Sequence, residues 1–229
     1  RSTVRRIAEL GYDGVEFFDY AGIPAQELRM LLADNGVEAI NAHVPLAKWR
    51  SDAGAEAAYA AAAGLPMITI PWIPPEERTA AVYAEIAARA PEWVAACAAA
   101  GVKAGYHNHE FEYDRFDGKA AMDIIGDASP ELLFELDTFW ILYAGLDPLA
   151  ELEKWRSRLG PVHIKDYTDI TSSPPQFCAI GHGDMPNRRI FEKAKELGVP
   201  WIVVEQDESP IDVFESARLG LQTLREYDE

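Results

Sequence analysis

The chain has few cysteines, few cationic side chains and no long apolar run, and each of these shortages argues against a class of protein. Its two cysteines, Cys97 in an expected helix and Cys178 in an expected loop, form no spacing motif, so no disulfide is needed. Lys and Arg number 21 against 38 Asp and Glu, and the net charge of −17 repels nucleic acid and anionic membrane surfaces. No run reaches transmembrane length, and residues 1–6 lack the apolar core of a signal peptide, so we expect a cytoplasmic protein.

Length and composition are those of an ordinary globular chain. The 229 residues are 48% hydrophobic and 10% aromatic, which suffices for a large core and argues against disorder. We therefore expect a single domain over residues 1–229. Because acidic side chains predominate, a neutral substrate or a cation is admitted more easily than an anion.

Helical segments that end at glycine alternate with short strand-like runs. An opening helix stops at Gly11, and seven strand candidates follow, with centres at Val15, Ile40, Ile68, Gly105, Phe134, Val162 and Val203. Repetition of helix, glycine and strand indicates βα units and a parallel sheet. We expect a TIM-type (β/α)8 barrel that lacks its first strand. A doubly wound open sheet is the alternative, but no Gly-rich phosphate loop follows the first strand.

The remaining segments are assigned from the same periodicity. Three further helices are expected over residues 75–100, 119–125 and 148–159. Residues 111–118 and 168–185 are expected to be loops. The second loop is long for a βα connection, and at a barrel rim such loops are lids, binding loops or solvated excursions.

Four of the strand candidates end on side chains that can bind a metal ion. These side chains are His107 with His109, Asp137, His163 and Glu205. Alternate residues of a barrel strand point inward, so His107 and His109 share one orientation, and the four endings would converge at one rim. Imidazole with carboxylates, and without thiolate, suits one divalent ion such as Mn²⁺, Co²⁺, Zn²⁺ or Mg²⁺.

Six segments together carry a family resemblance. They are residues 11–16 (GYDGVE), 42–44 (AHV), 106–112 (YHNHEFE), 136–140 (LDTFW), 163–166 (HIKD) and 204–207 (VEQD). The set resembles the sugar phosphate isomerase/epimerase family of xylose isomerase-like TIM barrels, which is related to inosose dehydratases and, more distantly, to endonuclease IV. The resemblance covers almost the whole chain, and it specifies no substrate.

The resemblance implies a divalent ion held by Glu, Asp, His and Glu on successive strands, with the two glutamates acting as acid and base through a cis-enediolate. Asp137, His163 and Glu205 match the last three ligands. The first glutamate falls at or near His107, where this chain departs from the pattern, unless Glu110 turns inward to replace it. With Glu205 as base and His107 or His109 as acid, elimination by a dehydratase or lyase becomes an alternative.

Weaker candidates lie at other strand ends. Lys165 shares the orientation of His163 and is a candidate to polarise a substrate carbonyl, although an ion pair at the rim explains it equally well. The residues expected to contact a sugar are Glu16, His43, Trp72, Glu110 and Trp140. For each aromatic residue alone, packing is the simpler interpretation.

These observations predict a metal-dependent sugar isomerase or epimerase that abstracts a proton next to a carbonyl. The expected partner is a small carbohydrate or polyol, with no nucleic acid, no membrane and a possible homo-oligomer. The alternatives are a keto-sugar or keto-inositol dehydratase, a glycoside lyase, and a non-catalytic sugar-binding relative. Abasic-site nuclease activity is disfavoured by the charge of −17 and by a total of only five histidines.

Overall fold

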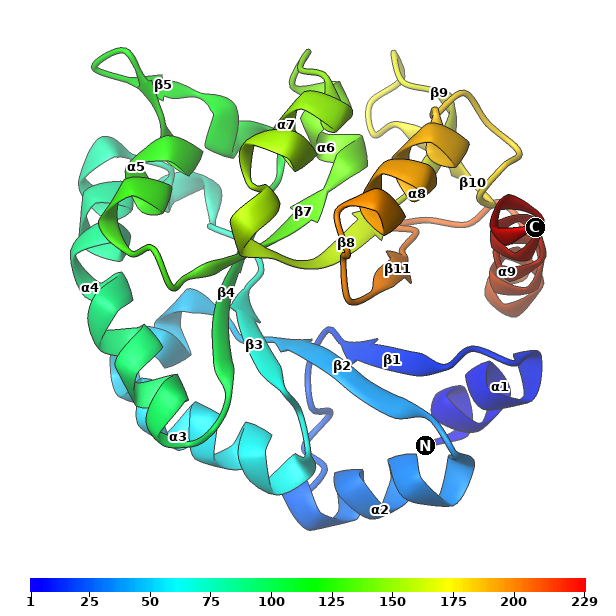
Figure 1. Ribbon diagram of the computed structural model, residues 1–229, viewed down its shortest axis with the longest axis horizontal. Helices are drawn as coiled ribbons and strands as arrows, with labels where there is room; N and C mark the ends of the chain where they lie inside the picture. The colour runs from blue at the N-terminus through cyan, green and yellow to red at the C-terminus, as the bar shows by residue number, and fades with distance from the viewer. The chain divides into compact units, whose positions relative to one another are not determined.

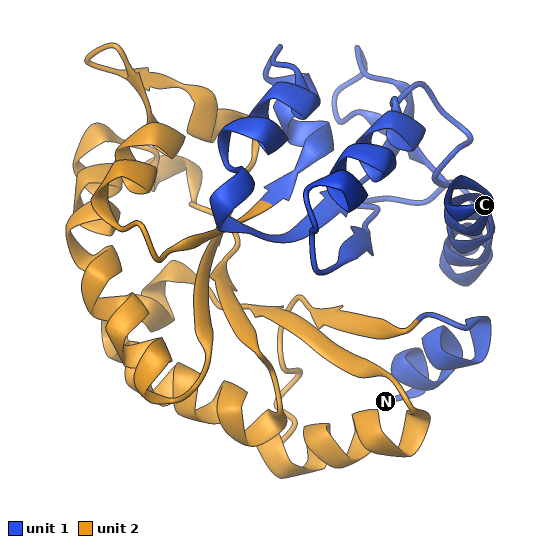
Figure 2. Cartoon of the chain, viewed as in Figure 1, with its two compact units in different colours: residues 1–12, 136–229 blue, residues 13–135 orange.

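The computed structural model describes residues 1–229, and its contacts divide the chain into two compact units (Figure 2). Unit 1 comprises residues 1–12 and 136–229, and unit 2 comprises residues 13–135. Each unit contains parallel strands and the helices that accompany them.

Unit 2 is built on parallel strands that pair in the order of the sequence. They are β1 (Gly14–Phe17), β2 (Glu38–His43), β3 (Met67–Ile70), β4 (Lys103–His107) and β7 (Leu133–Asp137), whose last two residues pass into unit 1. The helices between them are α2 (Ala25–Asn35), α3 (Leu46–Ala63), α4 (Ala80–Ala99) and α5 (Ala121–Ala128). In Figure 1, α2, α3 and α4 lie along the outer side of β1 to β4. This alternation places the carboxyl ends of neighbouring strands at one edge.

Local sequence explains where these helices begin and end. Gly36 and Gly64 end α2 and α3 in left-handed backbone conformations. Residues with a side chain rarely adopt these conformations. Thr79 caps α4 by accepting a hydrogen bond from the backbone of Val82. Fully buried side chains, among them Ile68 and Phe134, fill the core between strands and helices.

Unit 1 contains the parallel pair β8 (Leu159–Ile164) and β11 (Ile202–Val204). Its helices are α1 (Ser2–Leu10), α6 (Thr138–Tyr143), α7 (Pro148–Lys154), α8 (Asn187–Glu196) and α9 (Val213–Asp228). The first and last helices pack together: the Arg6 guanidinium lies 3.4 Å from the centre of the Phe214 ring, and the Tyr12 hydroxyl donates to the carbonyl of Ala217 at 2.8 Å.

The predicted fold class is confirmed. The chain is an α/β protein of the TIM-barrel type with seven parallel strands, one fewer than a complete barrel, and its first element is a helix. The expectation of a single domain stays a prediction. None of the helices combines the length and apolar character needed to cross a membrane. Both cysteines are buried and free.

Several predicted boundaries were wrong. The expected helix over residues 75–100 is a 3₁₀ turn, Pro75–Glu77, followed by α4, and the one over residues 148–159 ends at Lys154 before a second 3₁₀ turn, Arg156–Arg158. The helix expected over residues 119–125 begins two residues later and extends to Ala128. Helix α6 was missed because the Asp137 side chain starts it directly after β7, accepting bonds from Phe139 and Trp140.

The two expected loops contain short elements. Residues 111–118 lie in the 3₁₀ turn Glu110–Tyr113 and in the hairpin of β5 (Arg115–Phe116) with β6 (Lys119–Ala120). Residues 168–185 contribute to the antiparallel hairpin of β9 (Asp166–Asp169) and β10 (Gln176–Cys178). The carboxylate of Asp166 organises this segment, since it accepts backbone N–H bonds from Tyr167, Gly181, Gly183 and Met185.

Candidate functional site

Three of the predicted metal ligands lie together in unit 1. Asp137 is the last residue of β7, His163 precedes the last residue of β8, and Glu205 directly follows β11. One potential ligand atom of each lies within 4.8 Å of those of the other two. The strand ends therefore assemble an imidazole and two carboxylates, as the strand pattern predicted, and their role as ligands stays a prediction.

Hydrogen bonds orient these three side chains. Nδ1 of His163 lies 2.6 Å from Oε2 of Glu205, a contact that holds the imidazole ring beside the carboxylate. One oxygen of Asp137, Oδ1, caps helix α6. The backbone N–H of Glu205 donates to the carbonyl of Ile164 at 3.1 Å, which anchors Glu205 beside β8.

Lys165 is the fourth member of this cluster. Its side chain is only 1% exposed, and Nζ lies 2.8 Å from Oδ2 of Asp137, 3.1 Å from Oε2 of Glu205 and 3.1 Å from Oδ1 of Asp207. Burial alone lowers the pKa of Lys165, but Asp137, Glu205 and Asp207 together raise it above its ordinary value. Lys165 is therefore an ammonium group that ties the carboxylates together.

The charges of the unit 1 cluster suit a divalent ion. Asp137, Glu205 and Asp207 supply three carboxylates against the single ammonium of Lys165, which leaves two negative charges when all are ionised. Burial raises the pKa of Asp207, the expected response of a carboxylate that lacks a full counter-charge. A divalent cation would supply the missing charge, and the donor set of imidazole and carboxylate oxygens fits Mn²⁺, Co²⁺ or Zn²⁺.

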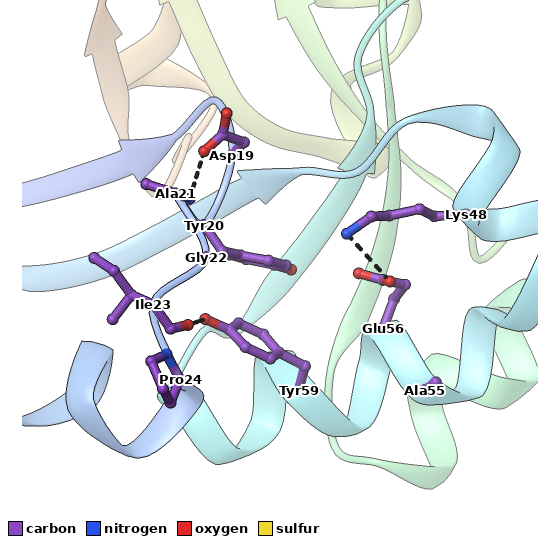
Figure 3. Close-up of a pocket in the computed structure, with 10 residues that line it drawn as sticks. All are labelled: Asp19, Tyr20, Ala21, Gly22, Ile23, Pro24, Lys48, Ala55, Glu56 and Tyr59. Atoms are coloured by element: carbon purple, nitrogen blue, oxygen red, sulfur yellow. Dashed lines mark hydrogen bonds and ion pairs between the residues drawn. The ribbon is translucent and has the colours of Figure 1, made fainter.

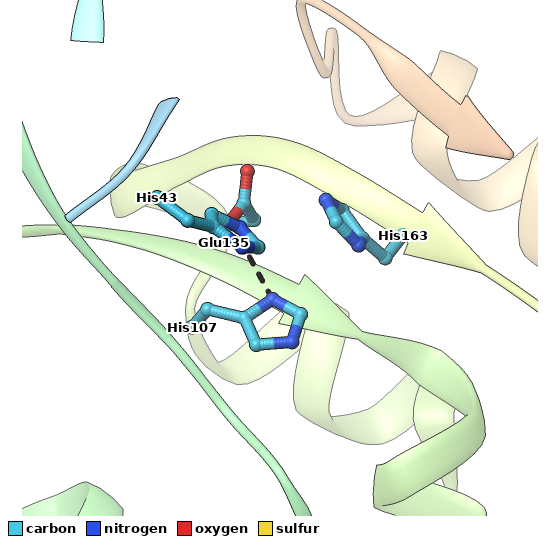
Figure 4. Close-up of side chains that lie close together, drawn as sticks. All are labelled: His43, His107, Glu135 and His163. Carbon is cyan, nitrogen blue, oxygen red and sulfur yellow. Dashed lines mark hydrogen bonds and ion pairs between the residues drawn. The ribbon is translucent and has the colours of Figure 1, made fainter. Parts of the chain in front are cut away.

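A second polar cluster lies in unit 2 around Glu135, two residues before Asp137 on β7. The Glu135 side chain is fully buried, and it accepts from Nδ2 of Asn41 at 2.7 Å and lies 2.8 Å from Nε2 of His43. His107, at the end of β4, approaches the same carboxylate with Nδ1 at 3.4 Å (Figure 4). Glu16, in β1, lies 3.2 Å from Nε2 of His43.

His43 is a buried cation in this second cluster. Burial lowers the pKa of its imidazole, but Glu135 and Glu16 raise it to about 10. At neutral pH one positive charge therefore stands between two buried carboxylates. Such an imidazolium can donate a proton to a developing oxyanion or leaving group.

His109, the other residue predicted to act as an acid, lies in the segment that follows β4. His109 stacks on Phe111 with ring centres 5.3 Å apart and contacts His107 edge to face at 5.1 Å. Glu110, expected as a possible inward carboxylate, is half-buried in the 3₁₀ turn. Glu112 is the carboxylate that turns inward: it is fully buried and accepts from the Tyr106 hydroxyl at 2.7 Å and from the backbone of His109 at 2.8 Å.

The two predicted tryptophan contacts differ in exposure. Trp72, two residues beyond β3, is 43% exposed and lies beside the Arg78 guanidinium at 5.3 Å. Trp140, in α6, is half-buried, and the ammonium of Lys165 lies 5.2 Å from its ring centre. Trp140 thus lies against the unit 1 cluster, whereas Trp72 is a partly exposed ring beside Arg78.

Sequence reasoning missed several polar residues of these clusters. Glu135 was overlooked although it shares the inward orientation of Asp137 two residues later, and the same alternation pairs Asn41 with His43 and Asp207 with Glu205. The signal is present in all three cases, since each overlooked residue lies two positions from a predicted site residue. Nothing in the pattern distinguished Glu112 from Glu110.

Solved structures share this fold. A sugar phosphate isomerase/epimerase from Parabacteroides distasonis has a TM-score of 0.80 at 22% identity, covering 96% of this chain and 86% of that chain. A D-allulose 3-epimerase from Methylomonas sp. has a TM-score of 0.74 at 16% identity, covering 98% and 90%. The probable 3-DHS dehydratase involved in petrobactin synthesis from Bacillus anthracis has a TM-score of 0.74 at 13% identity, covering 98% and 92%.

Identities this low establish a shared fold and leave the reaction open. No curated protein sequence matches the chain. At the level of the family the match is extensive, because it runs from residue 4 to residue 227 and includes both units. The chain belongs to the xylose isomerase-like TIM barrel family.

Proposed function

We propose that this chain is a divalent-metal-dependent isomerase or epimerase that removes a proton from the carbon next to the carbonyl of a carbohydrate or polyol. The proposal rests chiefly on the unit 1 cluster, in which Asp137, His163 and Glu205 offer ligand atoms within 4.8 Å of one another. These residues lie at the carboxyl ends of strands, where enzymes of this architecture carry their active sites. The epimerase and isomerase descriptions of the structural neighbours support the same reaction class.

The proposed ligands are Asp137, His163 and Glu205, with His107 as the fourth, at the position near which the first glutamate of the family pattern falls. With a divalent ion bound, these residues would provide Lewis acidity at the substrate carbonyl, and the adjacent C–H bond would become more acidic. The cluster's donor types, carboxylates and an imidazole around one ammonium group, fit such an ion.

Glu205 is the proposed base. Its carboxylate is 32% exposed, so a substrate can reach it, and it is held by Nδ1 of His163 at 2.6 Å and by Nζ of Lys165 at 3.1 Å. It takes the proton from the substrate carbon onto a carboxylate oxygen. Lys165 is unsuitable as a base because its neighbours keep it protonated, and its role is to orient Asp137 and Glu205.

The fate of that proton separates the two candidate reactions. Return of a proton to the opposite face of the same carbon completes an epimerisation, and its return to the neighbouring carbon, with a proton passing between the two oxygens, completes an isomerisation; His107 or His109 is the proposed acid. Loss of a neighbouring hydroxyl or alkoxyl group completes an elimination, and this second candidate is favoured by the imidazolium of His43, which remains protonated at neutral pH. Glu16 and the exposed face of Trp72 are proposed sugar contacts.

Exchange of the substrate C–H bond with solvent deuterium tests the proposal directly. Mn²⁺-loaded protein is incubated with a panel of keto-sugars in D₂O, and exchange and products are followed by NMR. Glu205→Gln removes the base but keeps the size and one oxygen, so exchange should fall roughly 10²- to 10⁴-fold. Glu196→Gln, an exposed residue of α8, is the matched control and should exchange normally.

The products assign the branch. A new epimer or ketose supports the first reaction, and release of water or an aglycone supports the second. Undiminished exchange in Glu205→Gln would remove this residue from the mechanism. Bound metal without exchange of any keto-sugar would instead indicate a non-catalytic sugar-binding relative.

A further inference from the structure

Unit 2 contains a pocket that the proposed reaction does not use. It has a volume of about 660 Å³ and lies between the loop that follows β1 and helix α3 (Figure 3). Its lining residues include Asp19, Tyr20, Lys48, Glu56 and Tyr59, and none of them is a proposed metal ligand or acid–base group. A volume of this size suits a small organic ligand.

One wall of the pocket is aromatic. The rings of Tyr20 and Tyr59 lie 4.1 Å apart with 32° between their planes. The Tyr59 hydroxyl donates to the carbonyl of Ile23, which ties α3 to the loop. The Tyr20 hydroxyl is buried and has no hydrogen-bond partner, although buried polar groups are normally paired.

The other wall is charged. Lys48 and Glu56 form an ion pair at 3.4 Å, and in Figure 3 the hydroxyl end of Tyr20 is directed towards them. Asp19 adds a second carboxylate, so the lining carries one net negative charge when all three are ionised. That charge, in a chain of net charge −17, disfavours anionic ligands. A neutral ligand with several hydroxyl groups could use the donors and acceptors together.

The loop beneath the pocket is held in an unusual conformation. Ala21 has a φ of 48°, a left-handed value that is costly for a residue with a side chain, and Gly22 follows with a φ of 66°. The Asp19 carboxylate accepts the N–H of Ala21 and holds this turn. Strain of this kind is commonly stored where a ligand is received.

We propose that this pocket binds a neutral sugar ring. An apolar pyranose face packs on Tyr20 and Tyr59, while its hydroxyls bond to the Tyr20 hydroxyl, Lys48 and Glu56.

Binding is measured without reference to turnover. Methyl β-D-glucopyranoside and cellobiose are titrated into metal-free protein, and the methyl signals of Ile23 and Ala55, which line the pocket, are followed by NMR. Both sugars should shift these signals saturably. Tyr20→Phe, which removes only the hydroxyl, should weaken binding roughly 3- to 10-fold. Lys48→Met should also weaken it, and Tyr227→Phe on α9 is the matched control.

The absence of saturable shifts at millimolar sugar would overturn the inference. An equal response to cyclohexanol, which has the ring size without the diols, or tighter binding of glucose 6-phosphate would also overturn it. Unchanged affinity in both Tyr20→Phe and Lys48→Met would overturn it as well. If sugar binds here but no keto-sugar exchanges its proton, the proposed reaction has failed and the pocket stands. If exchange occurs but no sugar binds here, the inference has failed and the proposed reaction stands.

Discussion

At the scale of single residues, the chemistry of this chain depends on buried charges that are incompletely compensated. Lys165 faces Asp137, Glu205 and Asp207, and His43 faces Glu16 and Glu135. Both arrangements are costly to bury and gain little stability over apolar packing. Carboxylates held in this way are prepared for a cation or a proton, which agrees with the proposed reaction.

Replacing Lys165 by Met should reveal this imbalance. The change keeps the side-chain stem but leaves the carboxylates without their ammonium, so the metal-free protein should lose about 3 to 5 kcal/mol of unfolding free energy. Urea unfolding with and without Mn²⁺ measures the effect. Mn²⁺ should stabilise Lys165→Met more than the wild type, because it binds the same carboxylates.

The exposed Lys195 serves as control for that experiment. Lys195→Met should change stability by less than about 0.5 kcal/mol. A Lys165→Met protein as stable as the control would show that the ammonium does not compensate the cluster.

Glu112 should make stability depend on pH. Burial raises the pKa of this carboxyl to about 8, although bonds from His109 and Tyr106 oppose the increase. Because the folded state holds the proton more tightly than the unfolded chain, its contribution is complete below about pH 4.5 and is lost as the pH rises through 8. The loss should be roughly 3 to 5 kcal/mol, since one pKa unit corresponds to about 1.4 kcal/mol.

Glu112→Gln tests this prediction by comparing urea unfolding from pH 4.5 to pH 9. The amide is neutral throughout, so the variant should lack this part of the pH dependence. Glu110→Gln, in the same 3₁₀ turn, keeps Glu112 and should retain it. Equal slopes in both variants would exclude Glu112 as the source.

At the scale of secondary-structure elements, the hairpin of β9 and β10 illustrates how one side chain organises a segment. Asp166 is the second residue after β8, and its carboxylate accepts hydrogen bonds from four backbone N–H groups of residues 167–185. Close packing accompanies these bonds: a Cβ added to Gly183 would meet the Tyr167 carbonyl, the Asp166 carboxylate and the Cys178 sulfur closer than real Cβ atoms approach.

Gly183→Ala should therefore destabilise the protein by about 1 to 3 kcal/mol, since the atoms that the new Cβ would meet include the backbone carbonyl of Tyr167, which cannot move freely. Thermal unfolding provides the measurement. Gly220→Ala within α9 is the control, because a Cβ there would make only ordinary contacts of 3.5 to 3.6 Å, and it should be neutral or stabilising by up to about 1 kcal/mol since alanine favours helix. Equal melting temperatures for Gly183→Ala and the wild type would show that the hairpin packs loosely.

At the scale of the whole molecule, folding and metal binding should be coupled. A ligand that binds only the folded state adds stability by mass action, about 2.7 kcal/mol at one hundred times its dissociation constant. Mn²⁺ should therefore raise the melting temperature of the wild type. His163→Gln should abolish most of this increase, whereas His182→Gln, an exposed histidine outside both clusters, should keep it.

An unchanged Mn²⁺ response in His163→Gln would exclude the unit 1 cluster as the binding site. His107→Gln tests the remaining ligand in the same assay. A smaller response in that variant would support His107 as the fourth ligand, and an unchanged one would remove it.

Local periodicity in the sequence sufficed for the fold class and for three members of the candidate site. The alternation of residues along a strand predicts which side chains share a face. A succession of βα units predicts that the parallel strands end at the same edge. Together the two patterns group Asp137, His163 and Glu205 from the sequence alone. The prediction depends only on residues near each other along the chain.

Tertiary structure decided which groups these residues meet. Lys165 contacts Asp137 and Asp207, 28 and 42 positions away in sequence, and Glu135 contacts Asn41 and His43 more than 90 positions away. The charge state of Lys165 and of His43 follows from those partners, because burial and opposite charge act in opposite directions on each pKa. Sequence pattern determines the face on which a side chain lies, but the balance of charge around it exists only once distant segments have packed together.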